Sequence, residues 1–224
     1  MEVLIMLNSS KRKQALSGWL KAMDPQEFSD PLKLQKFLFF YEIVSKTEEK
    51  DYELSKLKGY AGGPVFSDVY GDYRYNSELF NQVIVMALED NEIVIDEDIA
   101  TFCLFLIQTQ TREELSELTH ELDLWKSKQE MIEWGEYQVS LHESNLSETD
   151  VEFIKSLRGI YPKTYTDTVK IVKGTHKRFV FTSEDHQKLT STHYDTLKKL
   201  DKLDQLINPV HVEIDIDKGL LVYD

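Results

Sequence analysis

The sequence predicts an α+β protein that is predominantly helical. Apolar residues recur at i, i+3, i+4 and i+7 from Leu34 to Tyr41, the spacing of one helix face. From Val210 to Ile216 apolar and polar residues alternate instead, which is typical of a half-buried strand. We therefore expect a compact helical domain with small β elements at residues 11–135 and an α+β extension at 136–224 that ends in a β-hairpin. The alternative is that both parts pack as one unit.

The first part of the chain carries clear helix start and stop signals. One helix is expected at 11–23, and Asp30 and Pro31 are the expected N-cap and first residue of the next. The run Gly59–Pro64 predicts a loop, and a helix is expected to begin within Val65–Tyr70. Further helices are predicted at 77–89, at 96–108 and at 113–120, the last behind a capping box of Thr111 and Glu114.

Beyond Gly135 the character of the sequence changes. The polar stretch 136–145 is the predicted boundary, and Ser147 is the expected cap of a helix that runs to about Leu157. Two apolar runs on either side of Gly174 predict a hairpin, Val169–Val172 with Arg178–Phe181. A long helix is expected from Ser183, and the final strand is expected to turn back at Asp217–Gly219.

The composition favours an ordered, acidic protein. The 224 residues include 40 Asp and Glu against 26 Lys and Arg, a formal net charge of −14. A broad DNA-phosphate surface depends on Lys and Arg, so this balance argues against one and favours a partner with a basic face. The single cysteine, Cys103, lies in an apolar run and is expected in the core. The opening apolar run is too short for a signal peptide or a membrane span, so we expect a cytoplasmic protein without a membrane partner.

Three segments occur in an order and at a spacing that resemble one known family. They are Leu32–Tyr41 (LKLQKFLFFY), Gly62–Tyr70 (GGPVFSDVY) and Glu114–Glu121 (ELSELTHE), the last followed by Trp125. The pattern is similar to that of the Panacea domain, the SocA-like antitoxin family, and it covers about residues 14–135. Each motif is short, and their common order is what makes the resemblance specific.

The resemblance implies a non-enzymatic protein, without cofactor or metal, that binds and neutralises a cognate toxin by direct contact. Such proteins occur in bacteria, phages and mobile elements, and an alternative role is that of an adaptor that delivers a partner to a ClpXP-type protease. The matching motif residues are expected to be structural: Gln35, Gly63, Pro64, Val65, Leu118, Thr119, His120 and Trp125. The chain departs from the family at Leu57–Tyr60, where a Trp is common, and in its extension at 136–224.

A surface for the partner is expected around the glycine-rich loop. Tyr60, Tyr70, Tyr73 and Arg74 are of the residue types that are enriched where proteins dock. Lys33 and Lys36 lie off the apolar stripe of their helix and are expected to join this surface. The competing interpretation is that one or two of the tyrosines pack beneath the loop.

Other candidate groups do not favour a catalytic or metal site. Asp68 and Asp72 stand at i and i+4, but no third group completes a catalytic set, so a solvated helix face is expected. Gly62–Pro64 lacks the Lys and Ser/Thr of a phosphate-binding loop. His120 and Glu121 point apart as helix neighbours, so a role at the helix end is expected for His120. No histidine spacing matches a metal motif.

The predicted C-terminal hairpin concentrates positive charge in this acidic chain. The candidate basic patch consists of Lys170, Lys173, Lys177 and Arg178. It is the basis of an alternative function, a nucleic-acid-associated regulator whose affinity would fall steeply with salt. The competing interpretation is a solvated hairpin edge, where lysines prevent further strand pairing.

Overall fold

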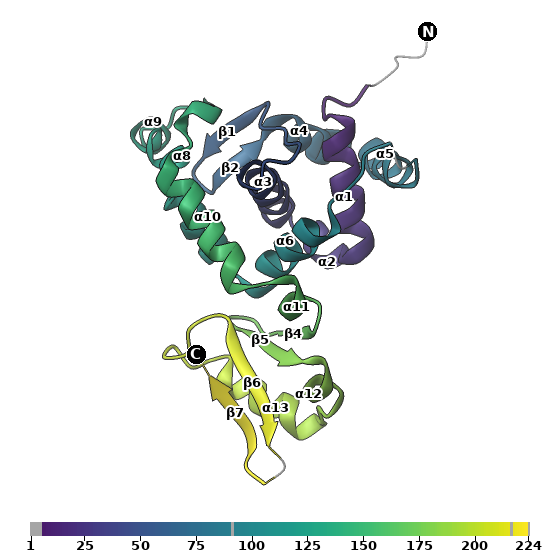
Figure 1. Ribbon diagram of the computed structural model, residues 1–224, viewed down its shortest axis with the longest axis vertical. Helices are drawn as coiled ribbons and strands as arrows, with labels where there is room; N and C mark the ends of the chain where they lie inside the picture. The colour runs from purple at the N-terminus through teal and green to yellow at the C-terminus, as the bar shows by residue number, and fades with distance from the viewer. Residues whose placement is uncertain (1–5, 91, 216, 224) are drawn as a thin grey trace.

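The computed structural model describes residues 6–90, 92–215 and 217–223. In this part of the chain α-helices dominate and two small sheets accompany them, so the predicted fold class, α+β and predominantly helical, is confirmed. Figure 1 shows most of the helices gathered around α3 (Pro31–Thr47), while the second sheet lies at one end of the molecule.

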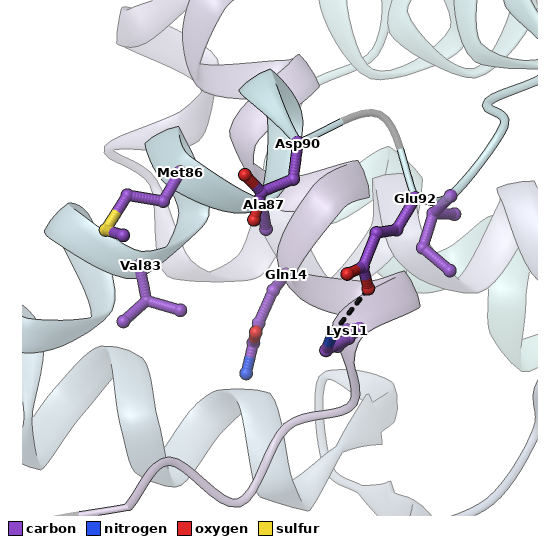
Figure 2. Close-up of a pocket in the computed structure, with 8 residues that line it drawn as sticks. Lys11, Gln14, Val83, Met86, Ala87, Asp90 and Glu92 are labelled. Carbon is purple, nitrogen blue, oxygen red and sulfur yellow. Dashed lines mark hydrogen bonds and ion pairs between the residues drawn. The ribbon is translucent and has the colours of Figure 1, made fainter.

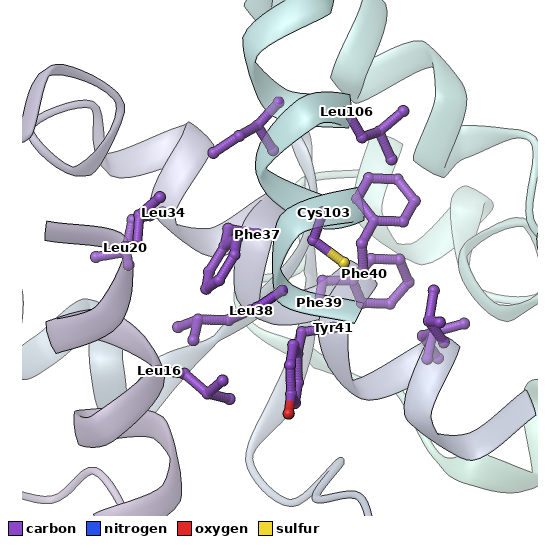
Figure 3. Close-up of a cluster of buried hydrophobic side chains, with 14 of the residues drawn as sticks. Leu16, Leu20, Leu34, Phe37, Leu38, Phe39, Phe40, Tyr41, Cys103 and Leu106 are labelled. Atoms are coloured by element: carbon purple, nitrogen blue, oxygen red, sulfur yellow. The ribbon is translucent and has the colours of Figure 1, made fainter. Parts of the chain in front are cut away.

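Helix α3 is the centre of the core. As predicted, Asp30 caps it and Pro31 occupies its first position, and the Asp30 carboxylate accepts hydrogen bonds from the N–H groups of Leu32 and Lys33. All of α3 from Lys33 to its end is buried except Lys46. Figure 3 shows its aromatic side chains pointing in several directions, with Cys103 of α6 among them. Cys103 is therefore a core residue, as expected, and burial raises the pKa of its thiol.

The other helices of this part pack around α3, and several begin at the predicted signals. Asp96 caps α6 through two backbone N–H groups, and Thr111 and Glu114 form the predicted capping box of α7. The helices expected at 11–23 and 77–89 are confirmed with these bounds. The full set is α1 (Lys11–Met23), α2 (Pro25–Phe28), α4 (Ser67–Tyr75), α5 (Ser77–Glu89), α6 (Glu97–Thr109), α7 (Arg112–His120), α8 (Asp123–Lys126) and α9 (Gln129–Glu133).

The first sheet lies beside α3 and has the strand order β2-β1-β3. Strands β1 (Leu57–Tyr60) and β2 (Gly63–Phe66) form a tight antiparallel hairpin, and β3 (Val139–Ser140) pairs with the other edge of β1. The predicted loop at Gly59–Pro64 is therefore wrong, because only the two residues between the strands form the turn. The glycines that suggested a loop instead permit the turn.

Beyond residue 135 the chain first returns to the helical core. After β3 and a short 3-10 turn (Glu143–Asn145), α10 (Glu148–Ile160) packs against α3. Leu141 and Ile154 belong to the same hydrophobic cluster as α3. The predicted cap, Ser147, begins α10, which runs past the expected end at Leu157. The hydrophobic core of the first part thus includes residues on both sides of 135, and the domain boundary placed there stays a prediction.

The second sheet has the order β4-β5-β6-β7. The predicted hairpins are confirmed: β4 (Val169–Lys173) pairs with β5 (Arg178–Thr182), and β6 (Val210–Asp215) pairs with β7 (Gly219–Tyr223). Strands β5 and β6 run parallel, so the chain between them must cross over the sheet. It does so through two helices, α12 (Ser183–Gln187) and α13 (Ser191–Leu200).

The single long helix predicted from Ser183 is therefore wrong. Thr190 accepts a hydrogen bond from the N–H of His193 and starts a new helix, which interrupts the pattern. One side of the sheet and α13 enclose a separate hydrophobic cluster that consists of Phe179, Phe181, Leu197, Val210 and Val212. This cluster is much smaller than the one around α3.

Several contacts attach the second sheet to the helical part. Lys173 Nζ of β4 lies 3.0 Å from the carboxylate of Asp24 and 2.5 Å from that of Glu27. Phe105 of α6 packs against Tyr161 and against Tyr165 of α11 (Lys163–Thr166), with ring centroids 4.9 and 5.8 Å apart. The Tyr165 hydroxyl in turn lies 3.0 Å from His211 Nδ1 of β6, and Asn208 Nδ2, just before β6, donates to the Glu114 carboxylate of α7 at 3.1 Å. Ion pairs, aromatic rings and these hydrogen bonds together attach the sheet.

Candidate functional site

Two consecutive side chains of α3 hold the β1–β2 hairpin in place. Gln35 Oε1 accepts a hydrogen bond from the backbone N–H of Phe66 at 2.8 Å. Lys36 Nζ donates to the carbonyl oxygen of Gly62 at 2.5 Å. Both side chains are buried. Helix α3 therefore fixes the end of β2 and the turn that precedes it.

The end of α7 and the beginning of α8 contact the same turn from another side. Thr119 Oγ1 accepts a second hydrogen bond from Lys36 Nζ at 2.8 Å, and Ser116 Oγ donates to the carbonyl of Gly62 at 3.2 Å. Trp125 Nε1 donates to the carbonyl of Tyr60 at 3.1 Å. The three segments that resemble the Panacea domain thus meet at one hairpin.

Gly63 is the position at which these groups leave no room for a side chain. Its φ is +100°, in the left-handed region that favours glycine. A Cβ atom there would lie 2.1 Å from Lys36 Nζ and 2.4 Å from Thr119 Oγ1. Of the remaining motif residues nearby, Pro64 is buried beside it, Val65 is half-buried, and Leu118 packs against the main hydrophobic cluster.

Lys36 is a buried cation without an anionic neighbour. Both of its hydrogen-bond acceptors are neutral, and in the described part of the chain no carboxylate pairs with it. Burial lowers the pKa of Lys36 to about 7, because nothing offsets the loss of solvent. Lys33 differs, since its Nζ lies 2.7 Å from the Glu27 carboxylate and donates to the carbonyl of Ile107. Burial lowers the pKa of Lys33 too, but Glu27 opposes the shift.

His120, the last residue of α7, stacks on Trp125 with ring centroids 3.9 Å apart. Burial, and then the charge of Lys36, lowers the pKa of His120. Its Nε2 is buried and has no hydrogen-bond partner among the described residues. The imidazole therefore favours its neutral form and serves as a ring packed against Trp125, next to the hairpin.

The structure corrects two of the expected interface residues. Lys33 and Lys36 are only 4% and 1% exposed, because α3 is enclosed on all sides and has no free polar face. These two side chains therefore do not form a docking surface. Tyr73 is half-buried, donates a hydrogen bond to the carbonyl of Ser29 and packs edge-on against Phe28, and its interface role stays a prediction.

The remaining expected interface residues, Tyr60, Tyr70 and Arg74, lie together on the surface. A further residue that the sequence did not indicate, Tyr137, lies beside them. Tyr60 lies between Tyr70 and Tyr137, with ring centroids 6.1 and 6.0 Å apart. Burial and these neighbouring hydroxyls, together with that of Tyr75, raise the pKa of Tyr60. Tyr75 and Tyr137 are 75% and 81% exposed. We call Tyr60, Tyr70, Tyr75 and Tyr137 the tyrosine cluster.

Tyr137 was not predicted as an interface residue because it lies in the polar stretch 136–145, which was interpreted as a domain boundary. The signal was present in the sequence: Trp134 and Tyr137 are large aromatic residues within an otherwise polar segment. Trp134 is 90% exposed. The pairing of β3 with β1 brings this segment to the hairpin, and such a contact between distant strands leaves no local pattern.

The carboxylates Asp68 and Asp72 are buried, so the solvated face expected for them is wrong. Asp68 pairs with the buried Lys13 at 3.1 Å. Asp72 accepts hydrogen bonds from the backbone N–H groups of Asn8 and Ser9 at 2.8 and 2.7 Å. Each carboxylate fastens α4 to the segment at the start of α1, and neither faces a reactant.

The basic hairpin uses most of its charges internally. Lys173 pairs with Asp24 and Glu27, Lys177 Nζ donates to the carbonyl of Leu206, and Arg178 donates to the carbonyl of Gly174. The carboxylate of Asp201 accepts hydrogen bonds from three backbone N–H groups of the turn, at residues 175–177. Of the candidate patch, Lys170 is the exposed member. Lys173 is thus paired with carboxylates, whereas Lys177 and Arg178 bond to neutral carbonyls and keep their charge. The basic patch therefore stays a prediction.

One pocket, of about 290 Å³, is lined by His120 and Trp125. Two further pockets lie elsewhere on the surface. Figure 2 shows one between α1 and α5, with Lys11 and Glu92 paired at one side and Val83 and Met86 at the other. No histidine, cysteine or hydroxyl side chain lines it among the described residues. The other, of about 270 Å³, lies beside the tyrosine cluster and is lined by Tyr70 and Arg74, among others.

Neither a metal centre nor a membrane segment emerges from the described residues. Nowhere in 6–90, 92–215 and 217–223 do three or more His, Cys, Asp or Glu side chains come close enough together to hold a metal ion. Within the same ranges, no helix has both the length and the apolar character needed to span a membrane.

Comparison with known proteins gives no match: no family model, no curated protein and no solved structure is similar to the chain.

Proposed function

We propose that this protein is an antitoxin-like binding protein that neutralises a cognate toxin by direct contact. The observation that carries the proposal is the tyrosine cluster, in which Tyr75 and Tyr137 are exposed and Tyr60 and Tyr70 are half-buried, beside the hairpin where the three motif segments meet. Tyrosine is enriched at binding hot spots because it offers a large, rigid contact area and a polar hydroxyl. Arg74, exposed at the end of α4, adds a charged anchor beside it.

The contacts beneath the hairpin support the proposal energetically. Lys36, Gln35 and Trp125 each bond to its backbone, so the strand that carries Tyr60 is fixed before any partner arrives. A surface that is already ordered loses less conformational entropy on binding. The toxin would be blocked sterically, which requires no chemistry from the antitoxin.

The internal use of charges in the β4–β5 hairpin favours this proposal over nucleic-acid binding. A phosphate-binding surface needs several free Lys or Arg side chains, because affinity comes from the counterions they displace. Lys173 instead pairs with carboxylates of α2 and its cap. A surface rich in tyrosine fits a protein partner better.

The test is co-expression with the product of the adjacent reading frame. Replacing Tyr75, Tyr137 and Arg74 by alanine together should abolish growth rescue and weaken binding at least about thirtyfold, the effect of losing one hot spot. All three are exposed, so the fold should remain. The matched control is Tyr194→Ala, a 41% exposed tyrosine on α13, and it should retain full rescue.

Retained rescue by the triple variant would contradict the proposed surface. Absence of any toxicity from the adjacent gene would contradict the antitoxin function. Loss of toxin protein only when an active protease is present would identify an adaptor instead of a steric inhibitor.

A further inference from the structure

The pocket beside the tyrosine cluster has an unusual set of charges for this chain. It lies between the first turn of α3, the β1–β2 hairpin and α4, and it encloses about 270 Å³. Its charged lining residues are Lys36, Arg74 and Arg112, and no Asp or Glu lines it among the described residues. In a protein of net charge −14, such a pocket is a local site for an anion.

The cations of this pocket are poorly compensated. Lys36 bonds only to neutral acceptors, as described above. Arg74 is exposed and makes no ion pair in the described part of the chain. Arg112 has its guanidinium 3.5 Å from Asp30, a loose contact in which the arginine side chain stays 56% exposed. A bound anion would therefore form favourable contacts with Arg74 and Arg112 without having to displace a strong ion pair.

The walls of the pocket restrict the kind of anion. Pro31, Leu32 and Val65 supply apolar surface next to the two guanidinium groups. Planar guanidinium groups match the two oxygens of a carboxylate, and an aliphatic stem can pack on the apolar wall. The volume lies below the range of about 300–1,000 Å³ that is usual for drug-sized ligands, so a side chain fits better than a whole cofactor.

The first turn of α3 disfavours a phosphate group. The Asp30 carboxylate already accepts hydrogen bonds from the N–H groups of Leu32 and Lys33, so these donors are occupied. Asp30 also places a negative charge near Arg112, which repels a dianion more than a single carboxylate.

We propose that this pocket binds a carboxylate carried by an acidic peptide segment of the partner protein, held by Arg74 and Arg112. The buried Lys36 adds positive potential to the site, because the low-dielectric interior screens its charge only weakly. That the carboxylate belongs to the partner protein rests on the proposed function, whereas the preference of the pocket for a carboxylate does not. The tyrosine cluster next to it would contact the residues that flank the acidic side chain.

The pocket can be tested on the full chain without any toxin. The probe is a pentaglutamate peptide blocked at both ends, titrated calorimetrically at low salt, with blocked pentaglutamine and inorganic phosphate as comparison ligands. We expect pentaglutamate to bind, and the double variant Arg74→Gln with Arg112→Gln to weaken it at least tenfold. The matched control, Lys170→Gln with Lys202→Gln, removes the same charge at two exposed lysines elsewhere and should change binding less than twofold.

A second readout follows from the position of Lys36. A bound carboxylate favours the charged form of Lys36, whose pKa burial lowers to about 7, so binding near pH 8 should take up protons. Proton uptake appears as a dependence of the binding enthalpy on the ionisation enthalpy of the buffer. Lys36→Met should abolish that dependence.

Three results would overturn the proposal: no preference for pentaglutamate over pentaglutamine, equal weakening by the control variant, or phosphate binding as tightly as the peptide. Pentaglutamine with a free C-terminus that binds as well as pentaglutamate would support carboxylate recognition and point to a chain end. Peptide binding that depends on the arginines, combined with unaffected toxin rescue by the same variant, would leave the pocket standing and contradict the proposed function.

Discussion

The helical core around α3 and the C-terminal sheet use charged side chains in opposite ways. In the helical part, Lys13, Lys33, Lys36 and Asp72 are buried and tie one element to another. In the sheet, the buried Asp201 closes a single turn, and Lys173 reaches outward to the helical part. Burying a charge is costly without partners, so each buried group is paired or hydrogen-bonded. In the helical part these contacts join different elements of a large core, whereas the Asp201 carboxylate bonds to backbone N–H groups of one turn.

The largest effects are expected from removing a buried aromatic ring from each of the two hydrophobic clusters, which differ in size. Phe40→Ala leaves a cavity in the centre of the α3 cluster and should cost about 3–5 kcal/mol of unfolding free energy. Phe179→Ala removes an equally buried ring from the small cluster of the sheet. Because that cluster is separate, we expect its loss to act locally, through opening of residues 169–223.

Hydrogen exchange distinguishes the two outcomes. Phe40→Ala should lower amide protection throughout the chain, whereas Phe179→Ala should lower it in β4–β7 and leave α3 protected. Equal loss of protection in α3 for both variants would show that the chain unfolds as one unit and would contradict an independent extension.

Local sequence signals were sufficient for most elements and failed where distant segments decide the structure. The caps Asp30, Thr111 and Ser147 act through neighbouring N–H groups, so their effect is readable from the sequence. The hairpin β1–β2 was missed because Gly63 and its neighbours signal a turn whether or not strands flank it. The third strand, β3, lies far along the chain, so its pairing with the other edge of β1 leaves no local signal.

The candidate site was predicted only in part for the same reason. The order and spacing of the motifs do not say that they meet at one hairpin, nor which of their side chains face inward. Lys36 stands off the apolar stripe and would be exposed on a helix with one free face. Helix α3 has no free face, which follows from its neighbours and not from its own residues.

The next test compares Gly63, where neighbouring side chains leave no room for a Cβ atom, with Gly135, where the space is open. Gly135 also has a positive φ, +88°, but a Cβ there would meet nothing within 4 Å. Gly135→Ala should therefore cost only the backbone strain, about 1–2 kcal/mol. Gly63→Ala should cost about 1–3 kcal/mol more, because it also displaces Lys36 and Thr119. Equal costs in chemical denaturation would show that the Lys36 contact does not constrain the hairpin.

The last test concerns the two buried lysines of α3, and it is a dependence on pH. In the unfolded chain Lys36 keeps its proton up to the ordinary lysine pKa of about 10.5, whereas in the folded protein burial lowers the pKa to about 7. Between these values the unfolded state binds more protons, so the contribution of Lys36 to stability rises with pH, by at most about 1.4 kcal/mol per pH unit. Below pH 7 both states are protonated and the penalty for burying the charge is complete.

Lys36→Met removes this dependence while keeping a side chain of similar length. The unfolding free energy of the wild type relative to Lys36→Met should therefore increase from pH 7 to pH 9, measured by urea denaturation. The same comparison for Lys33→Met should show a shallower rise, because Glu27 opposes the effect of burial there. If the difference for Lys36 stays constant over this range, Lys36 keeps its proton in the folded protein. The uncompensated cation that distinguishes α3 from the C-terminal sheet would then have an anionic partner after all.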